Sequence, residues 1–309
     1  MMTWNSALQG FSSYLRLERA LSANSIQAYI HDVKKLIEFL NIIGVEVQPQ
    51  HVTTTQLQQF VAYIAQLGVE PTSQARFISG LKTFYKYLLV EDIINDDPTA
   101  LLDAPKLSRK IPQVLSYDEV QLLLSVIDLS EPQGTRNRAM IETLYASGLR
   151  VSELIDLRLS NMFLDIGFIR VIGKGNKERL VPIGEDAIKH ILFYIKNVRN
   201  QQVIAKDNEN FVFLNRRGKK LTRVMVFLII KELAEIAGIK KDVSPHTFRH
   251  SFATHLLEGG ADLKAIQDML GHESITTTEI YTHLDKDYLR ETVLMFHPMN
   301  RRKVVEKEA

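Results

Sequence analysis

A short stretch rich in proline and cations divides this chain of 309 residues. The stretch is DAPKLSRKIPQV, residues 103–114, and it holds two prolines and three cations between blocks rich in apolar residues. Proline interrupts helices, and runs of this kind connect domains. A chain of this length normally folds as about two domains. The sequence therefore predicts a first domain of residues 1–102, a linker at 103–114, and a second domain of residues 115–309.

The first domain has the pattern of a helical bundle. Apolar residues at helical spacing predict a helix over about 26–40, with Asn24 and, three residues later, Gln27 as a capping pair at its start. A second helix is expected to open at Thr55, and a third to run from about 71 to 90. No internal repeat interrupts this pattern, so a compact all-helical domain is expected.

Two groups of basic residues are candidates for contact with nucleic acid. The helix expected at 71–90 carries Arg76, Lys82 and Lys86 on a polar face. The segment NRRGKKLTR, residues 215–223, has five cations and no acid, although the net charge of the chain is only +2. Taken alone, either group is more simply explained as a solvated surface. The candidate DNA-binding residues are Arg76, Lys82, Lys86, Arg216, Arg217, Lys219, Lys220 and Arg223.

The second domain mixes helices with a little β structure. FIRVIGKGNKERLVPIG, residues 168–184, has two β-rich runs around GKGNKE and predicts a hairpin. FVFLN, residues 211–215, predicts one further short strand, and helical patterns continue to about residue 296. The expected fold class is therefore mainly α, with a small β-sheet in an α+β C-terminal domain.

Composition excludes several kinds of site. The absence of cysteine rules out disulfides, thiolate metal sites and cysteine nucleophiles, and fits a reducing cytosol. The N-terminus lacks the apolar run of a signal peptide, and the longest apolar run, residues 224–230, is far too short to span a bilayer. We therefore expect a soluble, cytoplasmic protein with no membrane association.

The stretch HTFRHSFATH, residues 246–255, places three histidines and an arginine in ten positions. His246 and His250 have the spacing of zinc ligands on a helix, but Thr247 stands where a zinc protease needs its glutamate, and Arg249 would repel a metal ion. No metal site is expected. His246 and Arg249 could instead hold a phosphate, because arginine presents a charged, two-pronged donor to its oxygens. The alternative is that these histidines are ordinary surface or packed residues of the helix.

Four other residues stand in settings that suit phosphate chemistry. Arg150 follows the Gly148 turn in ASGLRVSEL, and Glu153 lies one helical turn further on, where it could orient the arginine. His272 follows a glycine in LGHES, and Tyr281 comes nine residues later. Each of these residues, taken alone, is more easily explained as a surface or packing residue.

Together, these segments resemble the tyrosine recombinases of the phage integrase family, and in particular their XerC/XerD type. The resemblance covers nearly the whole chain and is carried by SANSIQAYIHDVKKL, ASGLRVSEL, RVIGKGNKERLVP, FLNRRGKKLTR, SPHTFRHSFATHLLEGGADL and LGHESITTTEIYTH. It implies an N-terminal SAM-like helical domain that clamps DNA and a C-terminal catalytic domain. The last residues, MFHPMNRRKVVEKEA, resemble the family less.

The resemblance implies DNA strand exchange through a covalent intermediate. Tyr281 would attack a DNA phosphate, leaving the protein joined to the 3′ phosphate and releasing a 5′ hydroxyl. Arg150 and Arg249 would bind the nonbridging oxygens and stabilise the transition state. Because the phosphotyrosyl bond conserves the energy of the broken diester, no ATP and no cofactor are expected, and the sequence contains no GxxxxGK[ST] loop.

The remaining roles are also carried over from the family. His272 would donate a hydrogen bond to the same phosphate, and Lys174, in the hairpin, would protonate the leaving oxygen. His246 would position the tyrosine or accept its proton. Glu153 would support the site.

The implied biology is site-specific recombination that resolves chromosome dimers at cell division through a Holliday junction. The implied partners are a double-stranded DNA recombination site, three further protomers in a homo- or heterotetramer with a sister recombinase, and a DNA translocase of the FtsK type. The helix that contains residues 286–298 would dock into a neighbouring protomer rather than pack on its own domain, and the alternative is a terminal helix packed on its own domain. The alternatives are an integrase or transposase of a mobile element, a type IB topoisomerase, and a non-catalytic DNA-binding relative.

Overall fold

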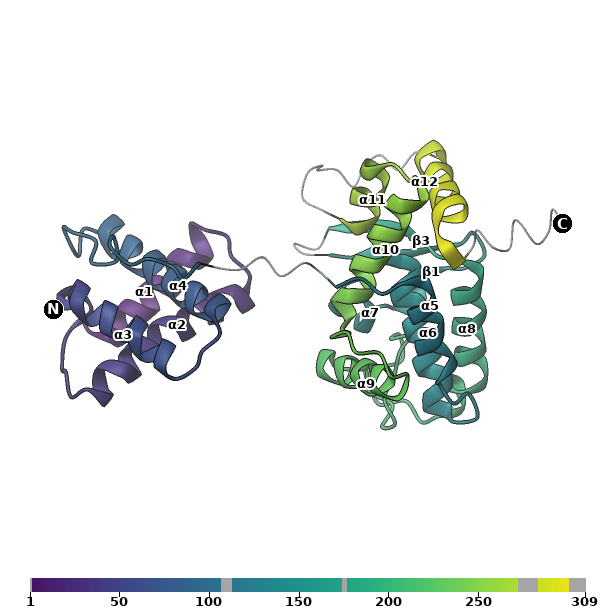
Figure 1. Ribbon diagram of the computed structural model, residues 1–309, viewed down its shortest axis with the longest axis horizontal. Coiled ribbons are helices and arrows are strands. Elements are labelled where there is room, and N and C mark those ends of the chain that lie inside the picture. Colours follow the sequence, from purple (N-terminus) through teal and green to yellow (C-terminus); the bar gives the residue numbers. More distant parts are fainter. Residues whose placement is uncertain (1, 107–112, 174–176, 272–282, 300–309) are drawn as a thin grey trace. The chain divides into compact units, whose positions relative to one another are not determined.

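The chain folds into two compact units, residues 1–110 and 111–309. The computed structural model describes residues 2–106, 113–173, 177–271 and 283–299 (Figure 1). The expectation of two domains, the first helical and the second α+β, is confirmed. The expected limits of the linker, at 103 and 114, stay predictions.

The first unit is a bundle of four α-helices with a short 3₁₀ turn, as far as the structure describes it. Its elements are α1 (Trp4–Leu17), α2 (Ala23–Ile42), η1 (Pro49–His51), α3 (Thr54–Gln66) and α4 (Pro71–Val90). The predicted limits of α4 are confirmed. The helix can begin at Pro71 because the first turn has no intrahelical partner for the N–H that proline lacks.

The true N-terminal caps of α2 and α3 each lie about two residues before the predicted ones. The cap of α2 is Ser22, whose hydroxyl accepts a hydrogen bond from the backbone of Ser25, and not Asn24. The cap of α3 is Thr53, which forms a reciprocal capping box with Gln56. In both cases a serine or threonine upstream supplied the side-chain acceptor that an N-terminus needs.

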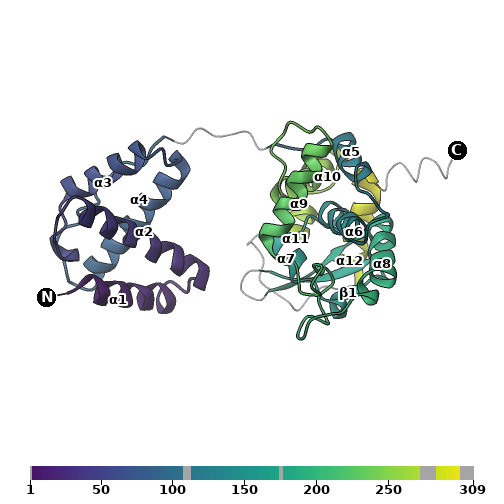
Figure 2. The same cartoon turned by 90° about the horizontal axis from the view of Figure 1, so that it is seen from below.

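The second unit is organised around α6, a helix buried along most of its length. Its helices are α5 (Tyr117–Ser125), α6 (Pro132–Ser147), α7 (Val151–Ile155), η2 (Leu159–Asn161), α8 (Glu185–Asn197), η4 (Arg199–Gln201), α9 (Arg223–Ile236), α10 (Pro245–Gly259), α11 (Leu263–Leu270) and α12 (His283–Phe296). Helices α8 and α10 both pack against α6 (Figures 1 and 2). Because α6 is so enclosed, the turn at its C-terminal end is held in a fixed position.

A small antiparallel sheet lies beside these helices. Its strands are β1 (Met162–Phe163), β2 (Phe168–Ile172) and β3 (Glu178–Pro182), in the order β1-β2-β3. The predicted hairpin is confirmed, with Ile172 opposite Glu178 at the end next to the connecting loop. The strand predicted at 211–215 is wrong. This segment forms only isolated bridges, Arg158 to Phe211 and Leu214 to Lys220, because its neighbours are loops and not strands.

Helix α12 packs on its own domain, contrary to the expectation that it would not, because its apolar residues find a partner face on α10. Leu289 and Val293 are buried in one apolar cluster with Phe252 and Leu256 of α10. Its outer face exposes Tyr288 and other residues. The docking of this helix into a neighbouring protomer stays a prediction. No helix in the described part of the chain is long and apolar enough to cross a membrane.

Candidate active site

The site begins at a turn that only glycine can make. Helix α6 ends at Ser147, and Gly148 caps it with φ of 57°, in the left-handed region. A Cβ atom on Gly148 would lie 2.5 Å from Cδ1 of Phe252. The turn therefore brings the chain close against α10 and delivers Arg150 to the first position before α7.

Glu153 holds Arg150 from one turn along α7. The backbone N–H of Arg150 donates to Glu153 Oε2 at 2.8 Å, and its Nη1 donates to Oε1 at 2.8 Å. A second Arg150 nitrogen, Nη2, donates to the carbonyl of Gly271 at 3.3 Å. About a third of the Arg150 side chain remains exposed. The arginine is thus fixed at its base and still reachable by a ligand.

Arg179 of β3 completes the support of this carboxylate. Its Nη1 and Nη2 donate to the two oxygens of Glu153 at 2.8 and 2.9 Å, and its Nε donates to the carbonyl of Met269 at 2.8 Å. The Arg179 side chain is only 7% exposed, and that of Glu153 only 2%. Burial tends to raise the pKa of Glu153, but the hydrogen bonds and charge of Arg179, with those of Arg150, hold it below its usual value.

Arg249 is held by backbone carbonyls on either side. Its Nη1 donates to the carbonyl of Gly148 at 2.8 Å and its Nη2 to that of Leu270 at 2.6 Å. These two carbonyls belong to the turn before Arg150 and to the last residue of α11. Arg249 is therefore anchored to the same two segments that position Arg150, which brings the two arginines into one cluster.

This cluster carries more positive charge than its own acid compensates. Three guanidinium groups, of Arg150, Arg179 and Arg249, lie around Glu153, with Arg249 at 4.0 Å from its Oε2. Burial and the charge of Arg150 lower the pKa of Arg249 to about 10, so it stays charged at neutral pH. Arg150 and Arg249 lie close together with a single acid between three guanidiniums, which favours an anion bound at the two arginines.

The three histidines of the HTFRHSFATH stretch have different positions on α10. His246 and His250 are exposed. His255 is buried, and its Nδ1 lies 2.8 Å from the hydroxyl of Tyr145. In the described residues, no group of three or more metal-binding side chains gathers here or elsewhere. His246 stands in the first turn of the helix, one turn before the buried Arg249.

Three of the six predicted catalytic residues, Lys174, His272 and Tyr281, lie outside the described residues. The segments that lead to two of them are well defined. Gly173 donates its N–H to the carbonyl of Lys177 at 2.8 Å, which closes the described part of the hairpin around residues 174–176. The carbonyl of Gly271, directly before His272, accepts a hydrogen bond from Arg150, and a Cβ atom on Gly271 would lie 3.1 Å from Cδ of Arg179.

The sequence motifs did not single out Arg179, which supports the Arg150–Glu153 pair. They indicated only that it lies in the hairpin. The available signal was the alternation of β3, because a position two residues before the apolar Val181 points to the same face. A buried arginine is often paired with an acid, and the glutamate three residues after Arg150 was available as that partner.

Of the predicted basic residues in the first unit, Arg76 differs from the two lysines. Arg76 pairs with the buried carboxylate of Asp32 on α2, so part of its charge is compensated. Lys82 and Lys86 are exposed and line a shallow hollow together with Arg19, Ser79 and Thr83. Arg19 was not predicted, because it stands beyond the end of α1 and far away in the sequence.

The predicted basic residues of segment 215–223 also differ in their surroundings. Lys220 pairs with Asp156 at 2.6 Å and lies over the ring of Phe211. Arg217, Lys219 and Arg223 are exposed. Arg216 lines a separate pocket.

Comparison with known proteins identifies the family of both domains. Residues 113–287 match the phage integrase family, and residues 8–92 match the phage integrase N-terminal SAM-like domain. The chain is 43% identical over 298 residues to tyrosine recombinase XerD of Chlorobaculum tepidum, covering 96% of this chain and 97% of that one. It is 42% identical over 294 residues to XerD of Listeria monocytogenes, covering 95% and 99%.

A solved structure shows the same fold. The XerH site-specific recombinase bound to a palindromic difH substrate, in a post-cleavage complex, aligns with a TM-score of 0.67 and 19% identity, over 97% of this chain and 83% of that one. The match of both domain models, together with the close relatives along almost the full length, establishes the relationship. The chain belongs to the phage integrase family of tyrosine recombinases.

Proposed function

We propose that this protein is a site-specific recombinase that cuts and rejoins DNA through a 3′-phosphotyrosyl intermediate. The observation that carries the proposal is the Arg150–Arg249 pair, fixed around Glu153 with excess positive charge. A phosphodiester under attack develops negative charge on its nonbridging oxygens. Fixed guanidinium groups stabilise that charge without reorganising during the reaction.

Each catalytic step is assigned to one side chain. Tyr281 attacks the phosphorus, and its oxygen forms the new P–O bond while the bond to the 5′ oxygen breaks. Lys174 gives its proton to that leaving oxygen, and His246 receives or orients the proton of the tyrosine. His272 donates to the same phosphate as Arg150 and Arg249. The reverse sequence, with another strand's 5′ hydroxyl as attacking group, rejoins the DNA without ATP or a cofactor.

Arg179 and Glu153 are positioning residues in this scheme. They hold Arg150 from behind, and Arg179 also fixes the end of α11 just before His272. Both arginines and His272 would then share one rigid frame.

Both domains are proposed to contact duplex DNA. In the first, the exposed Lys82 and Lys86 face the backbone, with Arg19 beside them. In the second, the cationic segment 215–223 does so. Arg76 would contribute less than its neighbours, because Asp32 already compensates its charge.

We propose chromosome-dimer resolution at cell division, through a Holliday junction, as the biological role. Four protomers would act together, with a sister recombinase or with copies of this chain, in the cytoplasm and under the control of a DNA translocase of the FtsK type. The relatives named XerD support this role over that of a mobile-element integrase.

The test traps the covalent intermediate. Host DNA bound by the Tyr281→Phe protein is sequenced to find the site, and a nicked duplex of that site is incubated with wild type. Wild type should form a denaturant-resistant protein–DNA adduct, and Tyr281→Phe should form none. Tyr288→Phe, which changes an exposed tyrosine on α12, is the matched control and should react like wild type. An adduct formed by Tyr281→Phe would place the nucleophile elsewhere.

A further inference from the structure

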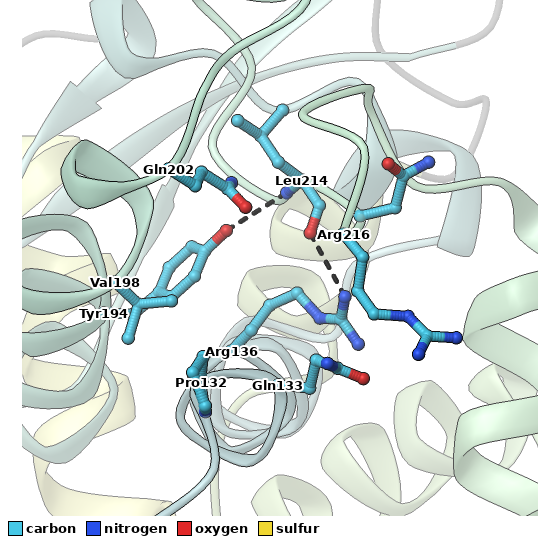
Figure 3. Close-up of a pocket in the computed structure, with 9 residues that line it drawn as sticks. Pro132, Gln133, Arg136, Tyr194, Val198, Gln202, Leu214 and Arg216 are labelled. Atoms are coloured by element: carbon cyan, nitrogen blue, oxygen red, sulfur yellow. Dashed lines mark hydrogen bonds between the residues drawn. The ribbon is translucent and has the colours of Figure 1, made fainter.

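A pocket at the far end of α6 from the active site has the features of an anion site. It is lined by Pro132, Gln133, Arg136, Tyr194, Val198, Gln202, Leu214, Asn215 and Arg216, and none of these nine residues is acidic (Figure 3). Arg136 lies in the second turn of α6, with Gln133 beside it, and Arg216 reaches in from the loop after Leu214 (Figure 3).

Arg136 is a buried cation with no acidic partner among the described residues. The residue is 5% exposed. Its Nη1 donates to the carbonyl of Leu214 at 3.2 Å, and its Nε and Nη2 donate to Asn137 Oδ1 at 3.1 and 2.8 Å. A guanidinium carries five N–H donors, so these neutral acceptors use three of them and leave one on each terminal nitrogen. A buried charge normally has a counter-charge, and this one can receive it from a ligand.

A second cation and a further donor point to the same ligand. Arg216 is exposed at the rim of the pocket. The burial of Arg136 lowers the pKa of Arg136, and the charge of Arg216 lowers it further. Gln202 Nε2 is a buried donor with no hydrogen-bond partner in the described part of the chain. The N-terminus of α6, which carries partial positive charge, opens beside these groups. Two guanidiniums and an amide N–H suit an anion with several oxygens.

This pocket is separate from the catalytic cluster. From Arg136 to Ser147, α6 rises by roughly 16 Å, and Arg150 stands beyond its end. The phosphate held by Arg150 and Arg249 therefore cannot also occupy the pocket.

We propose that the Arg136–Arg216 pocket binds a phosphate group, and that the DNA backbone supplies it. Arg216 is the second residue of the cationic segment 215–223, which ties the pocket to the surface proposed to lie on DNA. This source of the phosphate rests on the proposed function; the anion site itself does not. The contact would fix the register of the catalytic domain on the duplex without reading sequence.

The experiment observes the pocket directly in the full-length protein. Arginine side-chain Nε–H resonances are recorded by NMR, with Arg136→Lys used to assign the Arg136 signal. The protein is titrated with inorganic phosphate and then with a duplex DNA. The Arg136 signal should shift with both ligands, and the shift should be weakened in Arg216→Gln, which changes an exposed residue and should not disturb folding.

Salt dependence identifies the source of the phosphate. The slope of log affinity against log salt for duplex DNA should fall by about 0.9 in magnitude in Arg216→Gln, as for the loss of one phosphate contact. Lys196→Gln, an exposed cation of α8 outside the pocket, is the charge-matched control and should keep the wild-type slope.

Each outcome bears on a different part of the proposal. An Arg136 shift with inorganic phosphate, but an unchanged DNA slope in Arg216→Gln, would keep the anion site and overturn DNA as its source. No shift of Arg136 with either ligand would overturn the site altogether. Neither readout depends on strand cleavage, so a failure of the Tyr281 assignment would leave this test intact.

Discussion

Glu153 and Arg179 face each other through two parallel hydrogen bonds, of 2.8 and 2.9 Å, in the interior of the catalytic domain. The same two carboxylate oxygens accept the backbone N–H and Nη1 of Arg150. One buried acid of α7 therefore joins strand β3 to the residue directly before α7. Since Arg179 also donates to Met269, the end of α11 belongs to the same frame.

Replacing Glu153 by Gln should destabilise the fold and stop cleavage. The change removes the charge between buried guanidiniums, and breaking a buried pair on one side costs about 3–5 kcal/mol. Urea unfolding and adduct formation on the nicked site measure the two effects. Glu178→Gln is the control, because its pair with Arg170 is half exposed and should be worth less than about 1 kcal/mol. Equal stability of the two variants would contradict the central place of Glu153.

Arg179→Lys should keep the positive charge but no longer hold Glu153 and Arg150 in position. An ammonium group is a point charge and cannot make two parallel bonds to Glu153 together with a third to Met269. We expect DNA affinity within about threefold of wild type, since Arg179 is buried, and adduct formation slowed by roughly 10²-fold, as for a displaced catalytic group. A gel-shift titration and a single-turnover assay on the same DNA separate the two. Equal losses in both assays would indicate general unfolding.

The cleavage defect of Lys174→Ala should be rescued by a substrate with a 5′-phosphorothiolate linkage. A 5′-phosphorothiolate linkage has a sulfur leaving group that needs no proton, so removal of the general acid should slow cleavage of ordinary DNA only. Arg179→Lys supplies the comparison, because its defect should persist on both substrates. If Lys174→Ala were impaired equally on the two DNAs, Lys174 would bind or position and would not donate the proton.

The sequence predicted those parts of the fold that depend on local pattern. The hairpin at 168–184 and the limits of α4 followed from β-rich runs and from Pro71. The strand at 211–215 did not form, because a strand also needs a neighbour that the local pattern does not reveal.

The site was predictable only in part, for a similar reason. Arg150 and Arg249 stood in recognisable motifs. Their organisation by Arg179, and the pairing of Arg76 with Asp32, depend on contacts between residues 26 and 44 positions apart. No spacing rule within a helix or strand covers such distances.

Gly148→Ala should be far more damaging than Gly68→Ala. Both glycines have positive φ, 57° and 72°, so each alanine pays a similar backbone strain of about 1–2 kcal/mol. Only at Gly148 would the new Cβ meet other atoms, 2.5 Å from Phe252 Cδ1, whereas nothing lies within 4 Å at Gly68. We expect Gly148→Ala to lose a further ~1–3 kcal/mol by overpacking, and to slow cleavage by displacing Arg150. Urea unfolding of the two variants, read by the transition of each domain, measures the difference.

His297 should make the catalytic domain lose stability in mild acid. The ring is fully buried at the end of α12, 4.7 Å from the ring of Tyr145, and burial, with the charge of His255, lowers its pKa to about 3. The unfolded chain takes up the proton near pH ~6.5. Stability from the neutral ring is thus complete above about pH 6.5 and is lost as pH falls toward 3, by up to ~1.4 kcal/mol per pH unit.

The window from pH 6.5 to 4.5 separates this effect from the titration of Glu153. Glu153 has a pKa below its usual 4.5, so its contribution is lost only at more acidic pH. Urea unfolding at several pH values should give a shallower slope in His297→Leu than in wild type over this window. His255 and His190, whose pKa values burial also lowers, should leave part of the slope in place. His250→Leu, an exposed position on α10, is the matched control. The same slope in His297→Leu and wild type would mean that His297 is not held neutral by burial.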